Sequence, residues 1–336
     1  MFSQTSKIIQ EPFSLAHAKA YFLYISLTLG AFKFVCVLHH TLFVLAQTFI
    51  LSGTSLTEFG SDQGAWAVVT GCTDGIGKEF ARQLAEAGFN MLLVARNIDR
   101  LNSTAQEIEF KYGVKTRVHA VDFGKADDET YAELTETLKR YDIGVLVNNV
   151  GTSWQFARFV ETPLNKINDM IQINVNSLVR VTYAVLPRMI KRKRGLVLNV
   201  GSLSGEIPAP MLATYSSTKA FLATFTRAIA EEVRHDGVMV ENLNAYYVVS
   251  KLSGFRKSSI LVPTAEAYVR SALSKIGLPC GSAYSGRSNT SSPYWSHALF
   301  EWLVTPLVRS FPAISISVVH EMHKRALRRA AKGKAG

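Results

Sequence analysis

Short apolar runs alternate with longer amphipathic stretches from residue 65 to residue 245 of this 336-residue chain. The runs have the length and the β-branched content of buried strands, which we expect at 65–70, 90–95, 115–121, 144–148, 195–201 and 239–245. The stretches between them have the apolar spacing of amphipathic helices, expected at 75–88, 97–112, 127–141, about 164–192 and 214–236. Strands that alternate with helices predict βαβ units, so the expected fold class is α/β with a doubly wound parallel sheet.

The N-terminal part follows a different pattern. Residues 20–51 are apolar except for Lys33, the pair His39–His40 and a few small polar groups. At ~1.5 Å per residue the stretch 34–51 reaches about 27 Å, close to the thickness of a bilayer core. We predict a membrane anchor at 20–51 after a flank at 1–19, with a buried core helix or a cleaved signal peptide as alternatives. The pattern leaves open whether the chain crosses once or turns back at Lys33.

The remaining boundaries follow from composition. Residues 52–64 are small and polar and predict a linker, residues 65–280 form the α/β domain, and residues 281–336 form a C-terminal extension. Within the extension, 281–292 are rich in Ser and Gly and predict a loop. Residues 294–319 are apolar but interrupted by charges and prolines. They predict an interfacial or packed helical segment, with a second membrane span as the less favoured alternative.

Charge and cysteine content limit the kinds of partner and site that we expect for this chain. The formal net charge is +11, and the end "HKRALRRAAKGKAG" is strongly basic, which predicts contact with a membrane surface or a phosphorylated ligand. No nucleic-acid motif accompanies this charge, so we expect no nucleic-acid partner. The three cysteines are widely spaced and predict no disulfide framework. His320 and His323 lack a third ligand nearby, so we expect a polar helix face and no metal.

A glycine-rich stretch, "TGCTDGIG" at 70–77, follows the first predicted strand and opens the first predicted helix. Glycines let the backbone approach a pyrophosphate, and a helix N-terminus attracts its charge. The stretch therefore predicts a dinucleotide site in a Rossmann-type sheet, with a tight strand–helix turn as the alternative. The residues expected to bind the cofactor here are Gly71, Thr73, Asp74, Gly75, Ile76 and Gly77.

The end of the second strand indicates which nicotinamide cofactor is used. No acid stands at its tip, where a carboxylate would bind a free ribose 2′-hydroxyl, and Arg96 follows instead. An arginine there accommodates the 2′-phosphate, so we predict NADPH with Arg96 on that phosphate; a solvated arginine is the alternative. Asp122 closes the third strand and could accept from the adenine amino group, or it could be a structural turn residue.

Three side chains have the spacing of a proton-transfer site. Ser202 lies thirteen residues before Tyr215, and Lys219 lies four after it, on the same face of a helix. A tyrosine hydroxyl titrates near ~10, and a charged lysine nearby is expected to lower its pKa. The serine hydroxyl can bind a carbonyl oxygen while the tyrosine donates a proton to it and hydride arrives at the carbon. This set predicts the reduction of a ketone.

The motifs, in their order, resemble the short-chain dehydrogenase/reductase family: "TGCTDGIG", "NNVG" at 148–151, "NVNS" at 174–177, Ser202 and "YSSTK" at 215–219. The resemblance implies that Asn174 holds a water for a proton relay to Lys219, which also binds the nicotinamide ribose. It implies that Asn148, Asn149 and Gly151 support the sheet and the ribose side of the cofactor. Further cofactor contacts implied after the sixth strand are Val248 and Ser250.

The stretches "TDGIGK", "AVDF", "LATYSSTKAFL" and "SPYWSHALF", with the N-terminal apolar segment, look closer still to the membrane-bound very-long-chain 3-oxoacyl-CoA reductases and related 17β-hydroxysteroid dehydrogenases. This implies NADPH-dependent reduction of a 3-oxoacyl-CoA to the 3-hydroxyacyl-CoA in fatty-acid elongation. The alternatives are the same chemistry on a steroid or secondary-metabolite ketone, and a non-catalytic membrane-bound scaffold. One departure is Ala245–Tyr246, which stands where the family usually has Pro-Gly.

The last expectations concern location and partners. Lys332 and Lys334 resemble a dilysine retrieval signal, which implies the endoplasmic reticulum membrane with the catalytic domain facing the cytosol. The long-chain acyl-CoA substrate would place its phosphates on Arg256 and Lys257, although these cations could face lipid headgroups instead. Other expected partners are membrane lipid, other elongation enzymes and a second copy of the chain, through the helices at 164–192 and 214–236.

Overall fold

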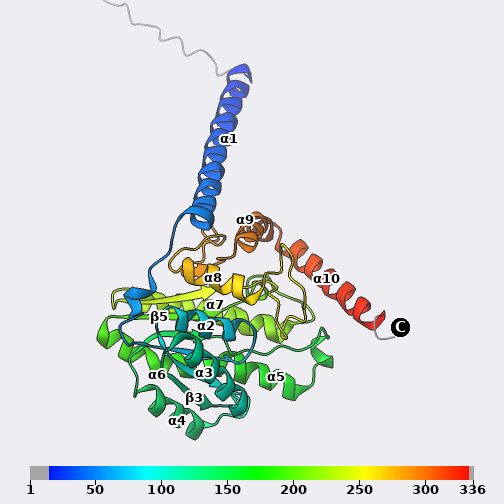
Figure 1. The fold of residues 1–336 in the computed structure, drawn as a ribbon. Coiled ribbons are helices and arrows are strands. Elements are labelled where there is room, and N and C mark those ends of the chain that lie inside the picture. Colours follow the sequence, from blue (N-terminus) through cyan, green and yellow to red (C-terminus); the bar gives the residue numbers. More distant parts are fainter. Residues whose placement is uncertain (1–14, 333–336) are drawn as a thin grey trace, which may run out of the picture. The chain divides into compact units, whose positions relative to one another are not determined.

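The computed structural model describes residues 15–332, which fall into two units divided between Phe43 and Val44 (Figure 1). The described part of the N-terminal unit is helical and belongs to α1 (Leu15–Leu45), whose last two residues fall in the second unit. A short π-helical segment, η1 (Ala46–Ile50), follows α1 directly. α1 passes through Lys33 without a break, so the described chain makes no turn there. The predicted linker carries one 3₁₀ turn, η2 (Leu56–Phe59).

The helix from His17 to Ile50 has 34 residues and is the one helix in the described part of the chain that is long and apolar enough to cross a membrane. Its length of about 51 Å exceeds the ~30 Å of a bilayer core. Large apolar side chains along it are exposed, among them Phe22 at 75% and Phe34 at 68%. The segment after residue 294 forms two helices, α9 (Trp295–Ser310) and α10 (Pro312–Lys332), in agreement with the predicted helical segment. A position at the membrane interface stays a prediction.

The second unit is built on a seven-stranded sheet in the order β3-β2-β1-β4-β5-β6-β7, with every pair parallel. The strands are β1 (Trp66–Thr70), β2 (Asn90–Ala95), β3 (Thr116–Ala120), β4 (Ile143–Asn148), β5 (Gly195–Val200), β6 (Val238–Leu243) and β7 (Thr290–Ser291). The predicted Rossmann-type fold class is thereby confirmed. The loop prediction for 281–292 is wrong at β7, because Thr290 and Ser291 pair with Asn242 and Leu243 of β6.

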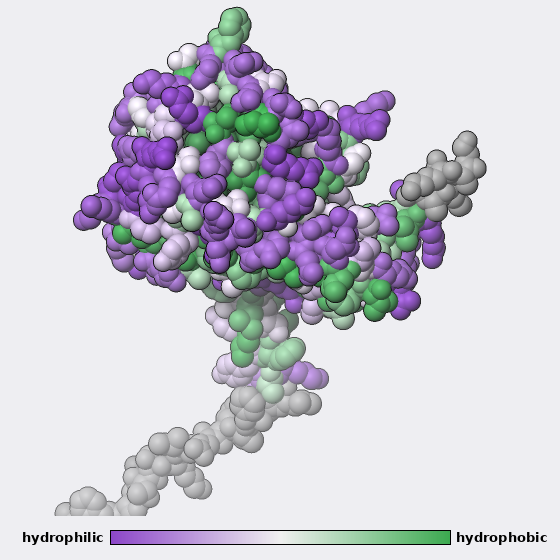
Figure 2. Space-filling view, turned by 90° about the horizontal axis from the view of Figure 1, so that it is seen from below, coloured by the Kyte–Doolittle hydropathy of each residue, from purple (hydrophilic) through white to green (hydrophobic). Residues whose placement is uncertain are grey.

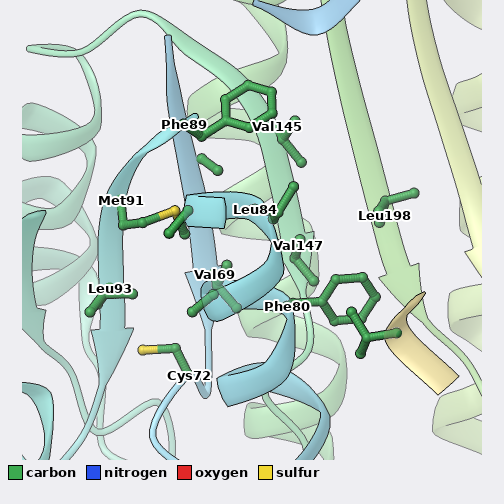
Figure 3. Close-up of a cluster of buried hydrophobic side chains, with 14 of the residues drawn as sticks. Val69, Cys72, Phe80, Leu84, Phe89, Met91, Leu93, Val145, Val147 and Leu198 are labelled. Atoms are coloured by element: carbon green, nitrogen blue, oxygen red, sulfur yellow. The ribbon is translucent and has the colours of Figure 1, made fainter. Parts of the chain in front are cut away.

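Helices cover both faces of the sheet because successive strand side chains point to opposite sides. Val69 packs in one buried cluster with α2, α3 and α8, and Val68 packs in the other with α4, α6 and α7. Figure 3 shows the first cluster, with Phe80 and Leu84 of α2 beside strand residues. The helices are α2 (Gly75–Glu86), α3 (Ile98–Tyr112), α4 (Asp128–Leu138), α5 (Leu164–Ile171), α6 (Ser177–Arg192), α7 (Ala213–Glu232) and α8 (Ala265–Ser274). Hydrophilic residues cover most of the face seen in Figure 2, with hydrophobic ones scattered among them.

Candidate active site

The glycine loop lies where β1 and β4 end side by side, at the point where the strand order reverses. Asn149, just after β4, donates from Nδ2 to the carbonyls of Thr70 and Gly71, at 3.0 and 3.1 Å. Gly77 packs against that same amide: a Cβ there would overlap Asn149 Nδ2 and the Gly71 carbonyl oxygen. Asn149 therefore fixes the shape of the loop, while its predicted role at the ribose side of the cofactor stays a prediction.

The first turn of α2 follows this loop and offers backbone N–H groups to a ligand. Asp74 is its N-cap and accepts from the Gly75 amide at 2.8 Å. Its carboxylate also pairs with Lys251 at 2.5 Å, and this partner holds the pKa of Asp74 below its usual value. A Cβ on Gly75 would lie 3.4 Å from the Ser250 side chain, so the segment after β6 reaches the glycine loop. In that segment, Val248 is buried.

The two residues predicted at the adenosine end lie at neighbouring strand ends. Arg96 directly follows β2 and is exposed. Asp122 follows β3 and accepts from the Gly124 amide at 3.1 Å, so its side chain stabilises the turn after that strand. Contact of either residue with a cofactor stays a prediction.

Ser202, Tyr215 and Lys219 meet beyond the end of β5. Ser202 caps the turn η5 (Leu203–Gly205), and its side chain lies near enough to Tyr215 to act on the pKa of that residue. Lys219 lies one turn after Tyr215 on α7, with Nζ 6.0 Å from the centre of the tyrosine ring. Its Nζ donates to the carbonyl of Val200 at 2.7 Å. The spacing in the sequence therefore corresponds to a real cluster.

Burial dominates the ionisation of this cluster. It raises the pKa of Tyr215, while the Ser202 side chain acts in the opposite direction. The lowering expected from Lys219 is therefore wrong for this structure, and Lys219 is not among the causes of the shift. The same burial lowers the pKa of Lys219 to about 8, so its charge changes close to neutral pH.

Asn174 lies in a π-helical turn, η4 (Gln172–Asn176), which interrupts the predicted helix 164–192 between α5 and α6. The predicted helix is present but is not continuous, because this turn divides it into α5 and α6. Such π turns are frequent at functional sites. The Asn174 amide accepts from the Thr152 N–H at 2.8 Å and donates to the Thr152 carbonyl and the Thr218 hydroxyl. A Cβ on Gly151 would lie 3.6 Å from Asn174 Oδ1 and 3.9 Å from Lys219 Nζ. Asn174, Gly151 and Lys219 therefore share one corner of the site.

A buried polar row supports the site from behind. Asn148 Nδ2 donates to Asn199 at 2.8 Å and to Thr182 at 3.0 Å, and Asn199 donates to Thr226 at 2.8 Å. These contacts join β4 and β5 to α6 and α7. Asn148 thus has the sheet-supporting position that the family resemblance implies.

A shallow pocket that is open to solvent lies beside Tyr215. Its other lining residues are Trp154, Gln155, Ala157, Phe159, Thr162, Met170, Met211, Leu212, Ala213 and Thr214. Sequence reasoning did not predict this wall, because its two segments are separated by more than forty residues and nothing in the stretch "LATYSSTKAFL" marks Leu212, Ala213 or Thr214 as pocket-lining residues. Arg256 and Lys257, predicted to bind substrate, are exposed and are not among the residues that line it.

The C-terminal extension reaches the serine loop through a buried ionic cluster that the sequence did not reveal. Arg287 pairs with Glu206, next to η5, at 2.6 Å and with Glu301 of α9 at 3.2 Å. Burial raises the pKa of Glu206. Tyr246, from the segment that replaces Pro-Gly, packs its ring 4.9 Å from His297 and 5.3 Å from Phe300. The departure at Ala245–Tyr246 therefore provides a contact with the extension.

Comparisons with known proteins agree with this geometry. The short chain dehydrogenase family model matches residues 65–259, more than half of the chain. The very-long-chain 3-oxoacyl-CoA reductase of Coprinopsis cinerea is 57% identical over 90% of this chain and 90% of its own length. The protein of the same name from Neurospora crassa is 40% identical over 92% and 91%.

Solved structures show the same fold. A short-chain dehydrogenase from Sphingobium yanoikuyae, in complex with NADPH, has a TM-score of 0.61 and 24% identity to this chain. The match covers 75% of this chain and 96% of that one.

Proposed function

The chain belongs to the short-chain dehydrogenase family, and on that premise we propose that it reduces a 3-oxoacyl-CoA to the 3-hydroxyacyl-CoA with NADPH in very-long-chain fatty-acid elongation. It is an oxidoreductase and uses a nicotinamide cofactor. The observation that carries the proposal is the meeting of Ser202, Tyr215 and Lys219 beside a pocket, in a chain 57% identical to a reductase of that name.

The residues around the glycine loop fit a dinucleotide. Gly77 packs closely against Asn149 and Gly71, and the first turn of α2 would offer its N–H groups to a pyrophosphate. Gly71, Thr73, Gly75 and Ile76 would lie along it, with Asp74 and Ser250 at its entrance. Arg96, Asp122, Asn149, Gly151 and Val248 would hold the two nucleoside ends. We choose NADPH over NADH because Arg96, and no acid, follows β2.

When bound, the cofactor supplies hydride to the carbonyl carbon. The Ser202 hydroxyl would hold the carbonyl oxygen, and Tyr215 would donate its proton to that oxygen. Burial supports this direction of transfer, because a raised pKa keeps Tyr215 protonated and ready to donate. Lys219 would return a proton to Tyr215 and bind the ribose.

Asn174 would complete the relay through its main chain. Its side-chain amide is already engaged by Thr152 and Thr218. With both amide hydrogens and one lone pair of Oδ1 in use, we place the relay water on the backbone carbonyl of Asn174, within the irregular turn η4.

We also infer membrane attachment through α1, on the endoplasmic reticulum with the domain facing the cytosol. On α10, Ile314, Val318 and Met322 lie four positions apart and are all more than half exposed, which fits a helix lying on a membrane surface. Basic side chains follow on the same helix, where anionic headgroups would meet them. The dilysine-like pair extends to Lys334, outside the described residues. An epitope tag read by microscopy with and without Lys332→Ser, Lys334→Ser would test the location.

A second copy of the chain and other elongation enzymes remain proposed partners. Tyr183 of α6 is 80% exposed and Phe221 of α7 is 42% exposed, so both helices offer apolar area to a partner. Light scattering of the detergent-solubilised chain, with Tyr183→Arg as comparison, would test a homodimer.

Substrate profiling is the experiment that tests the proposed activity. The purified full chain in detergent is given NADPH with 3-oxoacyl-CoA esters of increasing chain length, and separately with steroid ketones. We expect the highest kcat/KM with long acyl chains. Faster reduction of a steroid ketone would mean that the substrate is a steroid and not an acyl-CoA. No turnover of any ketone would support the scaffold alternative.

A further inference from the structure

His323 is the one buried side chain among the α10 residues whose side chains the structure describes, 312–329. Its exposed fraction is 8%, whereas Met322 beside it is 57% exposed. Ile316, Val319 and Ala326 are half-buried around it, so His323 is the most deeply buried contact of this helix. The two histidines of "HEMH" therefore differ in position, and only His323 is buried.

His323 contacts two segments that are far apart in the sequence. Its Nδ1 lies 2.7 Å from the carbonyl oxygen of Pro210. Because a carbonyl only accepts, Nδ1 donates the proton in this bond. Its ring stacks on Phe156, with centroids 4.5 Å apart and planes inclined by 27°.

Both segments form the wall of the pocket beside Tyr215. Phe156 stands between Gln155 and Ala157, which line the pocket, and Pro210 precedes Met211, which also lines it. The two segments are joined to each other by the Ala157 amide, which donates to the Met211 carbonyl at 3.1 Å. His323 therefore binds across the outside of the wall whose inside would face a substrate.

Met211 has an unfavourable backbone conformation. Its φ is +70°, in the left-handed region that side-chain-bearing residues rarely adopt. Such a conformation persists only where the surroundings hold it, and it is common at ligand sites. The contacts at Pro210 and at the Met211 carbonyl lie on either side of this φ angle.

We propose that His323 is a positioning residue of the substrate pocket, which makes α10 part of the active site. This inference rests on the proposed function, since it takes the pocket beside Tyr215 as the place of the ketone. The wall that His323 holds includes Trp154, Met211 and Leu212, whose apolar surface suits the hydrocarbon chain of a substrate rather than its charged end. His323 therefore acts on the affinity for long acyl chains through these residues, without touching the reacting atoms.

Three substitutions separate the two contacts. His323→Phe keeps the ring on Phe156 and removes the donor, His323→Asn keeps an N–H donor and removes the ring, and His323→Ala removes both. The matched control is His320→Phe, one turn earlier on the same helix. Each full-length variant is assayed in detergent with a long 3-oxoacyl-CoA and with acetoacetyl-CoA.

We expect His323→Ala to raise KM for the long substrate about tenfold and His323→Phe about fivefold, in line with the loss of one or two modest contacts. His323→Asn should recover part of the affinity that His323→Phe loses. The kcat, the KM for acetoacetyl-CoA and the Kd for NADPH should stay within twofold, as should every constant of His320→Phe. Unchanged KM in His323→Ala, or equal losses for both substrates and NADPH, would overturn the inference.

Amide hydrogen exchange gives a readout that needs no substrate. In His323→Ala, the amides of Ala157 and Leu212 should exchange at least several-fold faster, while those in the middle of α7 should not change. If the wild type reduces no acyl-CoA, the proposed function fails while this exchange still decides whether His323 holds the wall. Equal protection in both proteins would refute the positioning role.

Discussion

The glycine-loop region (65–151) and the C-terminal extension (281–332) both border the candidate active site, but different contacts hold them there. In the first region, residues close to one motif fix the geometry, as Asn149 does for Gly71 and Gly77. In the extension, single side chains act over long distances in the sequence. Arg287 pairs with Glu206, and His323 bonds to Pro210.

The difference separates the part of the chain that the family model covers from the part that lies beyond it. The glycine-loop region lies within the match to the family model, whereas the extension lies beyond its end at residue 259. A dinucleotide is recognised by backbone geometry, which many sequences can supply. A substrate wall depends on individual side chains, so it is free to vary. Changes in the two regions should therefore affect different measured constants.

The largest expected effect lies between the two regions, at the proposed proton donor. Tyr215→Phe keeps the ring and removes the acid, so kcat should fall about 10²–10⁴-fold, the usual contribution of general acid catalysis. The Kd for NADPH, measured by fluorescence titration, should stay near the wild-type value, since the glycine loop is unchanged. A variant that keeps more than a tenth of the wild-type kcat would contradict the assignment.

Next in size is the buried ionic cluster of the extension. Arg287→Leu leaves Glu206 and Glu301 buried without their shared cation, and breaking such a cluster typically costs about 3–5 kcal/mol of unfolding free energy. Denaturant unfolding in detergent measures it. Arg270→Leu is the matched control, because its pair with Glu266 is exposed at 71% and 57%. It should change stability by less than about 1 kcal/mol. Similar losses in both variants would show that burial of the cluster is unimportant.

Cofactor preference tests the glycine-loop region alone. Arg96→Asp replaces a cation with a carboxylate that repels a 2′-phosphate, so the ratio of kcat/KM for NADPH to that for NADH should fall about 10–100-fold. The KM for the acyl substrate should not change. An unaltered ratio would mean that another cation, such as Lys78 or Arg100, holds the phosphate.

The pH dependence of the rate tests the ionisation of Lys219. Burial lowers its pKa from 10.5 to about 8, so the charged form is lost as the pH rises through 8. If the relay needs the charged lysine, kcat/KM should fall about tenfold per pH unit above that value. Lys219→Arg stays charged, so its alkaline decline should disappear even if its rate is low.

Unfolding does not explain that decline. The unfolded chain, with the higher Lys219 pKa, binds more protons between pH 8 and 10.5. The contribution of Lys219 to stability therefore increases with pH over this window. A loss of rate together with a rising melting temperature would support the titration of Lys219. A wild-type kcat/KM that does not change up to pH 10 would rule it out.

The smallest effect concerns the proposed phosphate contacts of the substrate. Arg256→Glu, Lys257→Glu should raise KM for a long 3-oxoacyl-CoA about three- to tenfold, and more at low salt, where charges are least screened. Detergent micelles without lipid charge remove the competing role of these residues at headgroups. A small neutral ketone serves as control, and equal losses for both substrates would make the segment structural.

The sequence by itself determined the strand and helix order, the glycine loop and the Ser202–Tyr215–Lys219 cluster. Each rests on a short-range rule: side chains alternate along strands, apolar positions recur along helices, and residues four apart share a helix face. These rules hold whatever the distant parts of the chain do. They missed the π turn at Asn174, where backbone hydrogen bonding departs from the regular helix that the apolar spacing predicts.

Tertiary structure alone decided the direction of the Tyr215 pKa, the pocket wall and the role of the extension. Desolvation depends on everything packed around a group, so spacing to Lys219 could not give its outcome. Likewise no motif marks the contacts of Arg287, Tyr246 and His323, because their partners Glu206, His297 and Pro210 lie between about fifty and more than one hundred residues away. Such contacts exist only once the sheet has brought those segments together.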